Sequence, residues 1–344
     1  MKIVTFVHAC GPRLGFLDGG MVVDPAAWLA RGRNGQELAG AFSDAASFIR
    51  SGQTGLSAAR SVLDWSRGTG DGRVPVTESR LIAPVRPATI LCSGSNYHDH
   101  NAEKAPSDAS GKEPEFFVKT SDCIVGPNEP IILNRELTKK LDAEVELAVV
   151  IGRPGRNIPV DRALEHVFGY TIVNDVTARD QQVRKRPDGT VWYALGVGKV
   201  FDTSAPTGPC IVTAEEIPDP QALTIKSRVN GELRQGSTTA NMIWNVAQLI
   251  HFFSISMTLQ PGMLIITGTP SGTAWSCDAE LGGRWKGHSI DGEEMVPARG
   301  YLQPGDRVTC EIEKIGILEN VVAAAGPSNS SSQIGPSTKE HAPW

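Results

Sequence analysis

Two acidic residues alternate with apolar residues in one segment of the chain. Glu144 and Glu146 lie in residues 142–152, which read DAEVELAVVIG and favour a β-strand because Val and Ile dominate them. Strand side chains alternate between faces, so the two carboxylates would share one face, roughly 7 Å apart at the backbone. Buried like charges repel, and a divalent cation between them would relieve that cost. The pair therefore indicates a metal site, although on its own it also fits a solvated strand face.

A third carboxylate ends another predicted strand. Residues 167–175 read VFGYTIVND, so Asp175 comes directly after a β-branched run. Together with Glu144 and Glu146 it would make an all-oxygen ligand set, which suits Mg²⁺ first and then Mn²⁺ or Ca²⁺. Taken alone, Asp175 is equally consistent with a cap of a turn or helix.

A histidine and a glutamate stand three residues apart in residues 96–103, which read NYHDHNAE. On one helical turn His100 and Glu103 would share a face, and a carboxylate beside a neutral imidazole is a usual general-base pair. His98 competes for that role on spacing alone, and a solvated surface turn explains the segment equally well. Further along, Lys199 follows a Gly-rich loop, where it would face either an anionic intermediate or solvent.

Short strands and turns must position these groups. Residues 1–80 predict a small N-terminal α/β domain, residues 81–325 a larger domain of strands and loops, and residues 326–344 a disordered tail. The fold class is α+β, mainly β. One helix is expected at about 239–253, capped by Ser237, Thr238 or Thr239. Strands are expected at 1–7, 13–17, 21–24, 89–92, 123–125, 131–133, 145–151, 167–173, 224–229, 263–267 and 307–312.

Composition narrows the classes of function. The formal net charge is −5 without long runs of either sign, which argues against nucleic-acid or anionic-membrane binding. The six cysteines are scattered with no C-x-x-C, which argues against a zinc site and favours reduced thiols. No secretion signal is recognisable after Met1, so we expect a cytoplasmic protein.

Taken in order, these clusters resemble the fumarylacetoacetate hydrolase family over about residues 85–324. The run TGTPSG at 267–272, which turn chemistry alone would explain, belongs to the same series. The matching motifs are NYHDHNAE at 96–103, DAEVELAVVIG at 142–152, NDVTARD at 174–180, GKVFDT at 198–203, PGMLIITGTPSG at 261–272 and LQPGD at 302–306.

The resemblance implies a mixed β-roll that is usually a homodimer. It implies that Mg²⁺, or a similar ion, binds Glu144, Glu146 and Asp175, and it selects His100 over His98 as the partner of Glu103. Lys199 would assist catalysis, and Thr269 would hold the substrate's carboxylate. The residues implied to contact the substrate are Tyr97, Lys119, Arg179, Gln182 and Thr269.

The leading hypothesis is Mg²⁺-dependent hydrolysis of a C–C bond in a 2,4-dioxo acid such as an acylpyruvate. The ion would chelate the substrate, and His100 with Glu103 would activate water. The same site also supports decarboxylation or keto–enol isomerisation of a related 2-oxo acid, as in aromatic meta-cleavage pathways or with oxaloacetate. A third hypothesis is a non-catalytic homologue that binds a metal or an oxo acid. The long segment 273–300, with Trp275, is expected to influence specificity. The basic loop 183–189 would form either part of an anion entrance or, as is more typical of a short charge run, a solvated loop.

Overall fold

The computed structural model describes the chain except residues 10, 32–37, 105–112, 187, 189 and 327–344. Strands dominate the described residues and helices are few, so the predicted mainly β fold class is confirmed. Nearly all of the tail that we expected to be disordered lies outside the described residues. Of the strands expected from the sequence, those at 131–133, 145–151, 224–229 and 307–312 have the same bounds in the structure.

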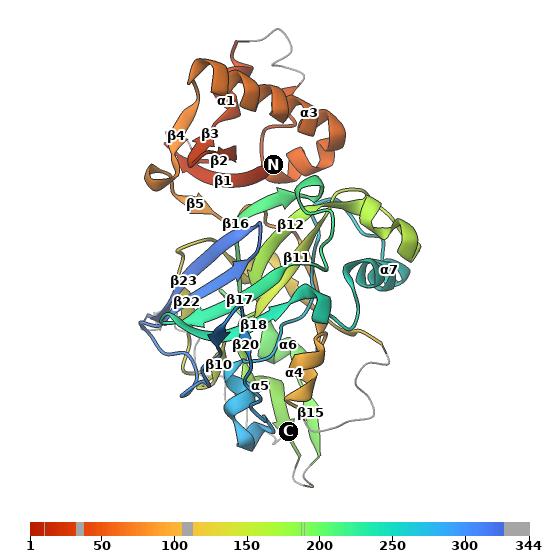
Figure 1. The fold of residues 1–344 in the computed structure, drawn as a ribbon, viewed down its shortest axis with the longest axis vertical. Helices are drawn as coiled ribbons and strands as arrows, with labels where there is room; N and C mark the ends of the chain where they lie inside the picture. The colour runs from red at the N-terminus through yellow and green to blue at the C-terminus, as the bar shows by residue number, and fades with distance from the viewer. Residues whose placement is uncertain (10, 32–37, 105–112, 187, 189, 327–344) are drawn as a thin grey trace, which may run out of the picture.

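One twelve-stranded sheet runs through the length of the molecule (Figure 1). Neighbouring strands along its main path are antiparallel, apart from the strands Leu264–Ile266 and Thr89–Gly94, which pair in parallel. Two short strands, β5 (Leu81–Ile82) and β8 (Ile124–Val125), pair beside this path. The path is β4 (Arg73–Pro75), β3 (Met21–Val23), β2 (Gly11–Asp18), β1 (Lys2–His8), β16 (Ala205–Thr213), β12 (Val167–Asn174), β11 (Val145–Ile151), β19 (Leu264–Ile266), β6 (Thr89–Gly94) and β7 (Glu115–Thr120).

The N-terminal strands continue the central sheet, because Lys2 of β1 pairs with Val212 of β16. Helices α1 (Pro25–Leu29) and α3 (Ala45–Thr69) lie on these strands at the top of Figure 1. α3 consists of two helical segments, since Gly52 between them has a φ of 56° that only glycine adopts readily. Helix α3 ends at Thr69, and strand β4 follows after a short turn. The division at residue 80 stays a prediction, and the sheet and both apolar clusters cross it.

A second, five-stranded sheet packs on the central one. Apolar side chains of both sheets form one buried cluster, to which β11 contributes Val145, Leu147 and Val149. The alternate β11 residues Ala148 and Val150 point to the opposite side, into the cluster that includes α3. The expected alternation is therefore present, and it places the acidic positions on the Ala148 side. In order, this sheet contains β18 (Glu232–Thr238), β17 (Thr224–Val229), β22 (Arg307–Ile312), β23 (Gly316–Ala324) and β9 (Ile131–Leu133).

Short elements surround the lower end of the central sheet in Figure 1, where the candidate residues gather. They come from segments that are distant in the sequence, so side chains from distant segments converge there. These elements are α4 (His98–Ala102), α5 (Arg179–Gln182), α6 (Leu195–Lys199), the pair β10 (Leu141–Asp142) and β13 (Thr177–Ala178), the hairpin β14 (Val183–Lys185) and β15 (Val191–Tyr193), and the pair β20 (Ser289–Ile290) and β21 (Glu293–Glu294).

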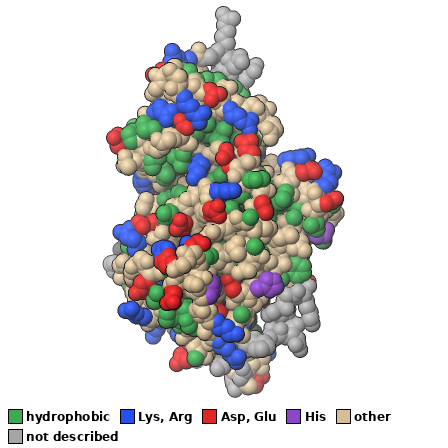
Figure 2. All heavy atoms as spheres, in the orientation of Figure 1, with side chains coloured by type: hydrophobic (Ala, Val, Ile, Leu, Met, Phe, Trp, Pro, Cys, Tyr) green, Lys and Arg blue, Asp and Glu red, His purple; other side chains and the backbone are tan. Residues whose placement is uncertain are grey.

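Charged side chains of both signs are interspersed over the face of the molecule in Figure 2. That distribution agrees with the even charge pattern of the sequence, which gave no reason to expect nucleic-acid binding. Within the described part of the chain, no helix is both long and apolar enough to cross a lipid bilayer.

The helix predicted at 239–253 begins later than expected. α7 spans Val246–Ser256, and the preceding residues form a strand and a short 3₁₀ turn. Asn96 holds the chain extended there, since its backbone and side-chain oxygens accept from Ile243 and Trp244 N–H. Asn245 and Gln248 then form a reciprocal capping box at the helix start. The apolar periodicity was therefore a correct signal for the helix, but the expected cap was wrong.

Replacing the observed cap should weaken the fold. Asn245→Ala is expected to lower the free energy of unfolding by about 1 kcal/mol, because it removes the acceptor for the Gln248 N–H. Thr238→Ala is the matched control, since Thr238 only accepts a long bond from Ala240 N–H. Urea denaturation followed by circular dichroism measures both. A larger loss for Thr238→Ala would contradict this assignment of the cap.

Candidate active site

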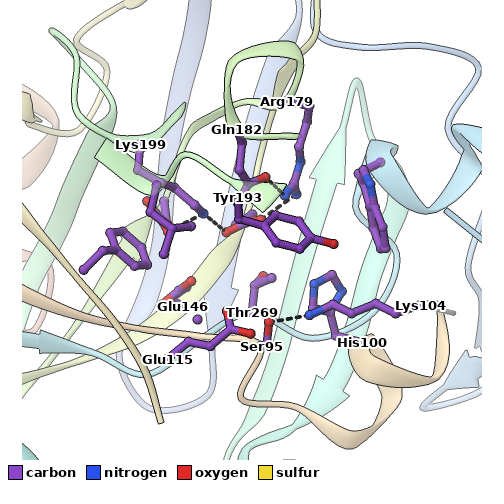
Figure 3. Close-up of a pocket in the computed structure, with 16 residues that line it drawn as sticks. Ser95, His100, Lys104, Glu115, Glu146, Arg179, Gln182, Tyr193, Lys199 and Thr269 are labelled. Carbon is purple, nitrogen blue, oxygen red and sulfur yellow. Dashed lines mark hydrogen bonds and ion pairs between the residues drawn. The ribbon is translucent and has the colours of Figure 1, made fainter. Parts of the chain in front are cut away.

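One cavity collects most of the residues singled out in the sequence (Figure 3). Its empty space is about 560 Å³ when the open mouth is included. Strands β11 and β12 supply its acidic end, α5 and α6 its basic wall, and α4 the histidine. Of the predicted residues, those that line it are His100, Glu144, Glu146, Asp175, Arg179, Gln182, Lys199 and Thr269.

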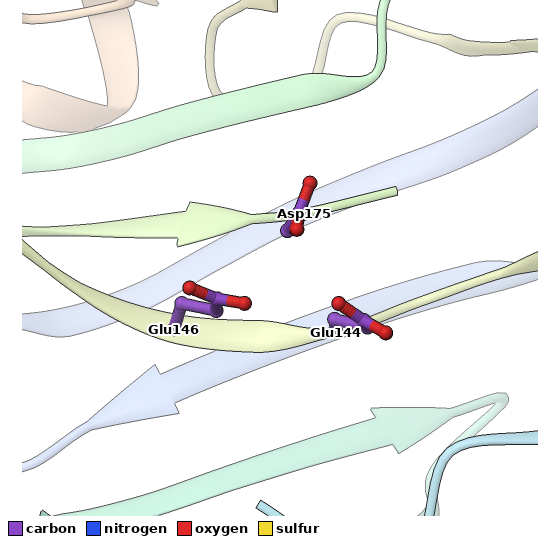
Figure 4. A group of neighbouring side chains, drawn as sticks. All are labelled: Glu144, Glu146 and Asp175. Carbon is purple, nitrogen blue, oxygen red and sulfur yellow. The ribbon is translucent and has the colours of Figure 1, made fainter. Parts of the chain in front are cut away.

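The three acidic residues come together as the sequence predicted (Figure 4). Each offers a carboxylate oxygen, and these oxygens all lie within 4.8 Å of one another. Antiparallel pairing brings them together: Val145 lies opposite Asn174, and the Asp175 N–H donates to the Glu144 carbonyl at 2.8 Å. All three side chains are buried.

Two cations balance part of this buried negative charge. Lys199 Nζ lies 2.6 Å from both a Glu144 oxygen and an Asp175 oxygen. Arg179 contacts Glu144 at 2.5 Å and is itself held by Asp142 at 2.8 Å. Burial alone would raise the pKa of Glu144, but Arg179 and Lys199 outweigh burial and lower it to about 2. Glu144 is therefore ionised throughout the physiological range.

Glu146 is balanced differently from its neighbours. Its carboxylate accepts from the backbone N–H of Gly268 at 2.7 Å, and among the described residues no Lys or Arg forms an ion pair with it. Burial raises its pKa, and the charges of Asp175 and Glu144 raise it further. A cation bound by the three carboxylates would remove this penalty. The donor set, oxygen atoms alone, fits a hard divalent ion such as Mg²⁺ or Mn²⁺.

The structure brings together His100 and Glu103, the residues predicted to act as a general base. His100 lies on α4, and its Nδ1 is 3.3 Å from an oxygen of Glu103 at the end of that helix. Glu103 is fully buried behind the histidine and accepts from the Gly272 N–H at 3.1 Å. Burial raises the pKa of Glu103 to about 8. Burial and then Lys104 lower the pKa of His100, so its imidazole is neutral and able to accept a proton.

The turn at 267–272 supports the acidic cluster from the other side. Gly268 has a φ of 89°, and a Cβ on it would lie 2.7 Å from Asn96 Cβ, so only glycine fits there. The Thr269 hydroxyl donates to the Val145 carbonyl at 3.0 Å and accepts from Gln235 at 2.8 Å. In this structure the turn's amide holds a protein carboxylate, that of Glu146; the contact of Thr269 with a substrate carboxylate stays a prediction.

Tyr97 and Lys119 are not brought to the cavity. Tyr97 is fully buried where it precedes α4. Lys119 is fully buried behind Asp175, 2.9 Å from its carboxylate, and also donates to the Ser204 carbonyl at 2.8 Å. Direct contact of either residue with a substrate stays a prediction that this geometry does not support. From its position Lys119 acts on the site through Asp175.

Sequence reasoning gave no role to Asp142, which does not line the cavity, or to several residues of the lining itself. Asp142 opens the acidic motif yet received no role, although it holds Arg179 and also accepts from the N–H groups of Ala274 and Trp275. Trp275 stands edge-on to His100, with 5.8 Å between ring centroids, so the long segment 273–300 does reach the site. Helical spacing from His100 was the available signal for Lys104. Further lining residues are Ser95, Lys104, Glu115 and Tyr193.

Comparison with known proteins agrees with this geometry. Residues 89–323 match the family model described as fumarylacetoacetate (FAA) hydrolase C-terminal. The chain belongs to the fumarylacetoacetate hydrolase family. This membership and the fold predicted from the resemblance are thereby confirmed.

Named members of the family are similar over most of the chain. A mitochondrial oxaloacetate tautomerase of Bos taurus is 37% identical, covering 94% of this chain and 91% of its own. An oxaloacetate tautomerase of Bacillus subtilis is 35% identical, covering 80% of this chain and 84% of its own. Among solved structures, maleylpyruvate hydrolase from Sphingobium sp. SYK-6 with manganese(II) and pyruvate superimposes with a TM-score of 0.68 at 26% identity, covering 95% and 100%.

Because the charge of Glu146 has no cationic partner in the protein, Glu146→Gln should affect thermal stability differently with and without a divalent ion. Without divalent ions near pH 7, Glu146→Gln should melt at a higher temperature than the wild type, because it removes an acid whose ionised form is penalised in the folded state but keeps an acceptor for Gly268. The folded-state pKa lies above the unfolded value, so the wild-type penalty grows as pH rises above about 4.5. Adding MnCl₂ should stabilise the wild type and have little effect on the variant. Thermal denaturation with and without manganese measures both effects; equal stabilisation of the two proteins would contradict the metal site.

Proposed function

We propose that this protein is a tautomerase that interconverts the enol and keto forms of an oxaloacetate-like 2-oxo acid. The observation that carries the proposal is the placement of His100, a neutral base, on the same cavity as the three buried carboxylates. The similarity to two proteins named oxaloacetate tautomerases favours this reaction over the C–C hydrolysis that led the sequence-based hypotheses. The alternative weighed from the sequence is thus better supported.

Tautomerisation requires one proton to move between carbon and oxygen. Glu144, Glu146 and Asp175 would hold a divalent ion, which when bound supplies a Lewis acid for the 2-oxo acid end. Glu103 contacts Nδ1 of His100, which leaves Nε2 to take the proton from C3 and return it to the enolate oxygen. Burial alone would lower the pKa of Lys199, but the charges of Asp175 and Glu144 outweigh burial and raise it. Lys199 therefore stays protonated, and its ammonium would stabilise the negative enolate.

Hydrolysis and decarboxylation remain further candidates for the same site. A structural relative is named a maleylpyruvate hydrolase, and hydrolysis would use His100 to deprotonate a water instead of carbon. We favour proton transfer because it needs only the groups described above, whereas hydrolysis also requires a water molecule positioned for attack. The non-catalytic hypothesis is disfavoured, since a binding protein has no use for the contact between His100 and Glu103.

A spectroscopic assay separates these activities. Enol-oxaloacetate dissolved freshly in buffer should lose its ultraviolet absorbance faster with Mg²⁺- or Mn²⁺-loaded protein than with the ion alone. Pyruvate formed from acylpyruvates would instead support hydrolysis, and carbon dioxide release from oxaloacetate would support decarboxylation. If no ketonisation above the background rate is detected with either ion, the proposal is wrong.

The two histidines of α4 provide a matched pair of variants. His100→Ala should lower the rate of ketonisation by about 100-fold or more, the usual contribution of a general base, while manganese binding is retained. His98→Ala should keep full activity, because His98 is exposed and does not line the cavity. Ketonisation kinetics together with manganese titration by calorimetry measure both properties. A fully active His100→Ala protein would exclude the mechanism.

We also propose Mg²⁺ as the resident ion and a homodimer as the assembly. The first rests on the oxygen-only ligand set. The second rests on the family resemblance and on exposed apolar residues of β15 and α6, among them Trp192 and Val197. Analytical ultracentrifugation measures the stoichiometry directly. The predicted cytoplasmic location stays a prediction, and one relative is named mitochondrial.

A further inference from the structure

Lys104 extends into the cavity from the side of His100. It follows α4 four residues after His100, and its ammonium donates to the Ser95 hydroxyl. In Figure 3 the Lys104 side chain passes the His100 ring and ends beside Ser95. Both Lys104 and Ser95 line the cavity. The cavity therefore has a second lysine besides Lys199, and this one lies beside His100.

Lys104 differs from the other cations of the site in its partners. Lys119, Arg179 and Lys199 each contact a carboxylate at 2.9 Å or less. Within the described part of the chain, Lys104 has no carboxylate at ion-pair distance. Burial lowers its pKa. The charges of Glu115 and Glu144 oppose this shift, and those of Arg179 and Lys199 add to it, so that the net direction is downward.

The acid that faces Lys104 does not neutralise it. Glu115 lines the same cavity, but it is an exposed residue and forms no ion pair with Lys104 among the described contacts. Solvent screens an exposed carboxylate more strongly than a ligand enclosed in the cavity. An anionic group of a bound ligand would therefore supply the partner that the protein lacks at this point.

We propose that Lys104 is the specificity-determining residue that receives the distal carboxylate of a 2-oxo dicarboxylic acid. This assignment rests on the proposed function and deepens it, since it distinguishes diacids from neutral acylpyruvates. With the 2-oxo acid end at Glu144, Glu146 and Asp175, a short diacid presents C3 near His100 and its second carboxylate at Lys104 and Ser95. Acylpyruvates with an uncharged acyl group would leave Lys104 without a counter-ion.

A purely structural role for Lys104 makes a different prediction. Ser95 has a φ of 52°, and its carbonyl accepts from the Asn101 side chain at 2.8 Å, so Lys104 could serve only to support that turn. Loss of such support would weaken every ligand of the cavity equally. A contact with the distal carboxylate would weaken only the ligands that carry one.

Two inert ligands that differ by one charge separate these roles. Malate and its 4-methyl ester share the 2-hydroxy acid end and chain length, and neither undergoes tautomerisation. We expect Lys104→Met to weaken malate binding by about tenfold or more in the manganese-loaded protein, a usual loss for a charged hydrogen bond. Affinity for the ester should change less than twofold. Lys104→Arg should restore most of the preference for malate, and Lys139→Met, at an exposed lysine outside the cavity, should leave both affinities unchanged.

Calorimetry measures the dissociation constants of both ligands for the wild type and each variant, and circular dichroism checks that each variant is folded. If Lys104→Met weakens both ligands alike or leaves their ratio at the wild-type value, the assignment is wrong. The ligands are not turned over, so this result is independent of catalysis. Wild-type protein that fails to accelerate ketonisation of oxaloacetate but shows the expected change of ratio would refute the proposed reaction and keep the role of Lys104. Should Lys104→Met fail to fold, the ratio for Lys104→Gln decides in the same way.

Discussion

Burial of three carboxylates at the ends of two paired strands is the constraint on which the rest of the site depends. Glu144 and Asp175 are adjacent because β11 and β12 pair in one register, and Glu146 lies one alternation further along β11. Moving ionised groups out of water costs several kcal/mol each unless opposite charge is close. Lys199 balances the charges of Glu144 and Asp175. Glu146 has no such partner among the described residues, and a divalent cation bound by the three carboxylates would balance its charge.

The charge balance also ties distant segments to the cavity. The Asp142 carboxylate forms an ion pair with Arg179 and also accepts from the backbone N–H groups of Ala274 and Trp275. The same carboxylate thereby orients the guanidinium towards Glu144 and fixes the segment that places an indole against His100. One buried residue, Asp142, therefore links the loop 273–300 to the acidic cluster.

The cavity has two ends with different chemical meaning. In the proposed reaction the acidic end would bind the part that all 2-oxo acids share, and hydrolases, isomerases and tautomerases of one family could hold that part in common. The residues Ser95, Lys104 and Tyr193 line the same cavity and would meet the part of the substrate that differs. Under the proposed role of Lys104, selectivity between a diacid and a neutral diketone would depend on one counter-ion, because an unpaired ammonium disfavours the ligand that cannot neutralise it.

Sequence patterns alone determined the strands rich in β-branched residues, the shared face of Glu144 and Glu146, and the spacing of His100 and Glu103. These features depend on local geometry, which the order of residues specifies. Strand β16 was missed because Pro206 and Pro209 disfavour a central strand, and tertiary pairing overrides that preference. Only the tertiary structure decided which cation meets which carboxylate, and why Lys119 lies behind the cavity while Lys104 opens into it. Such pairings join residues far apart in the chain, so sheet register and burial set them, and neither is encoded in local spacing.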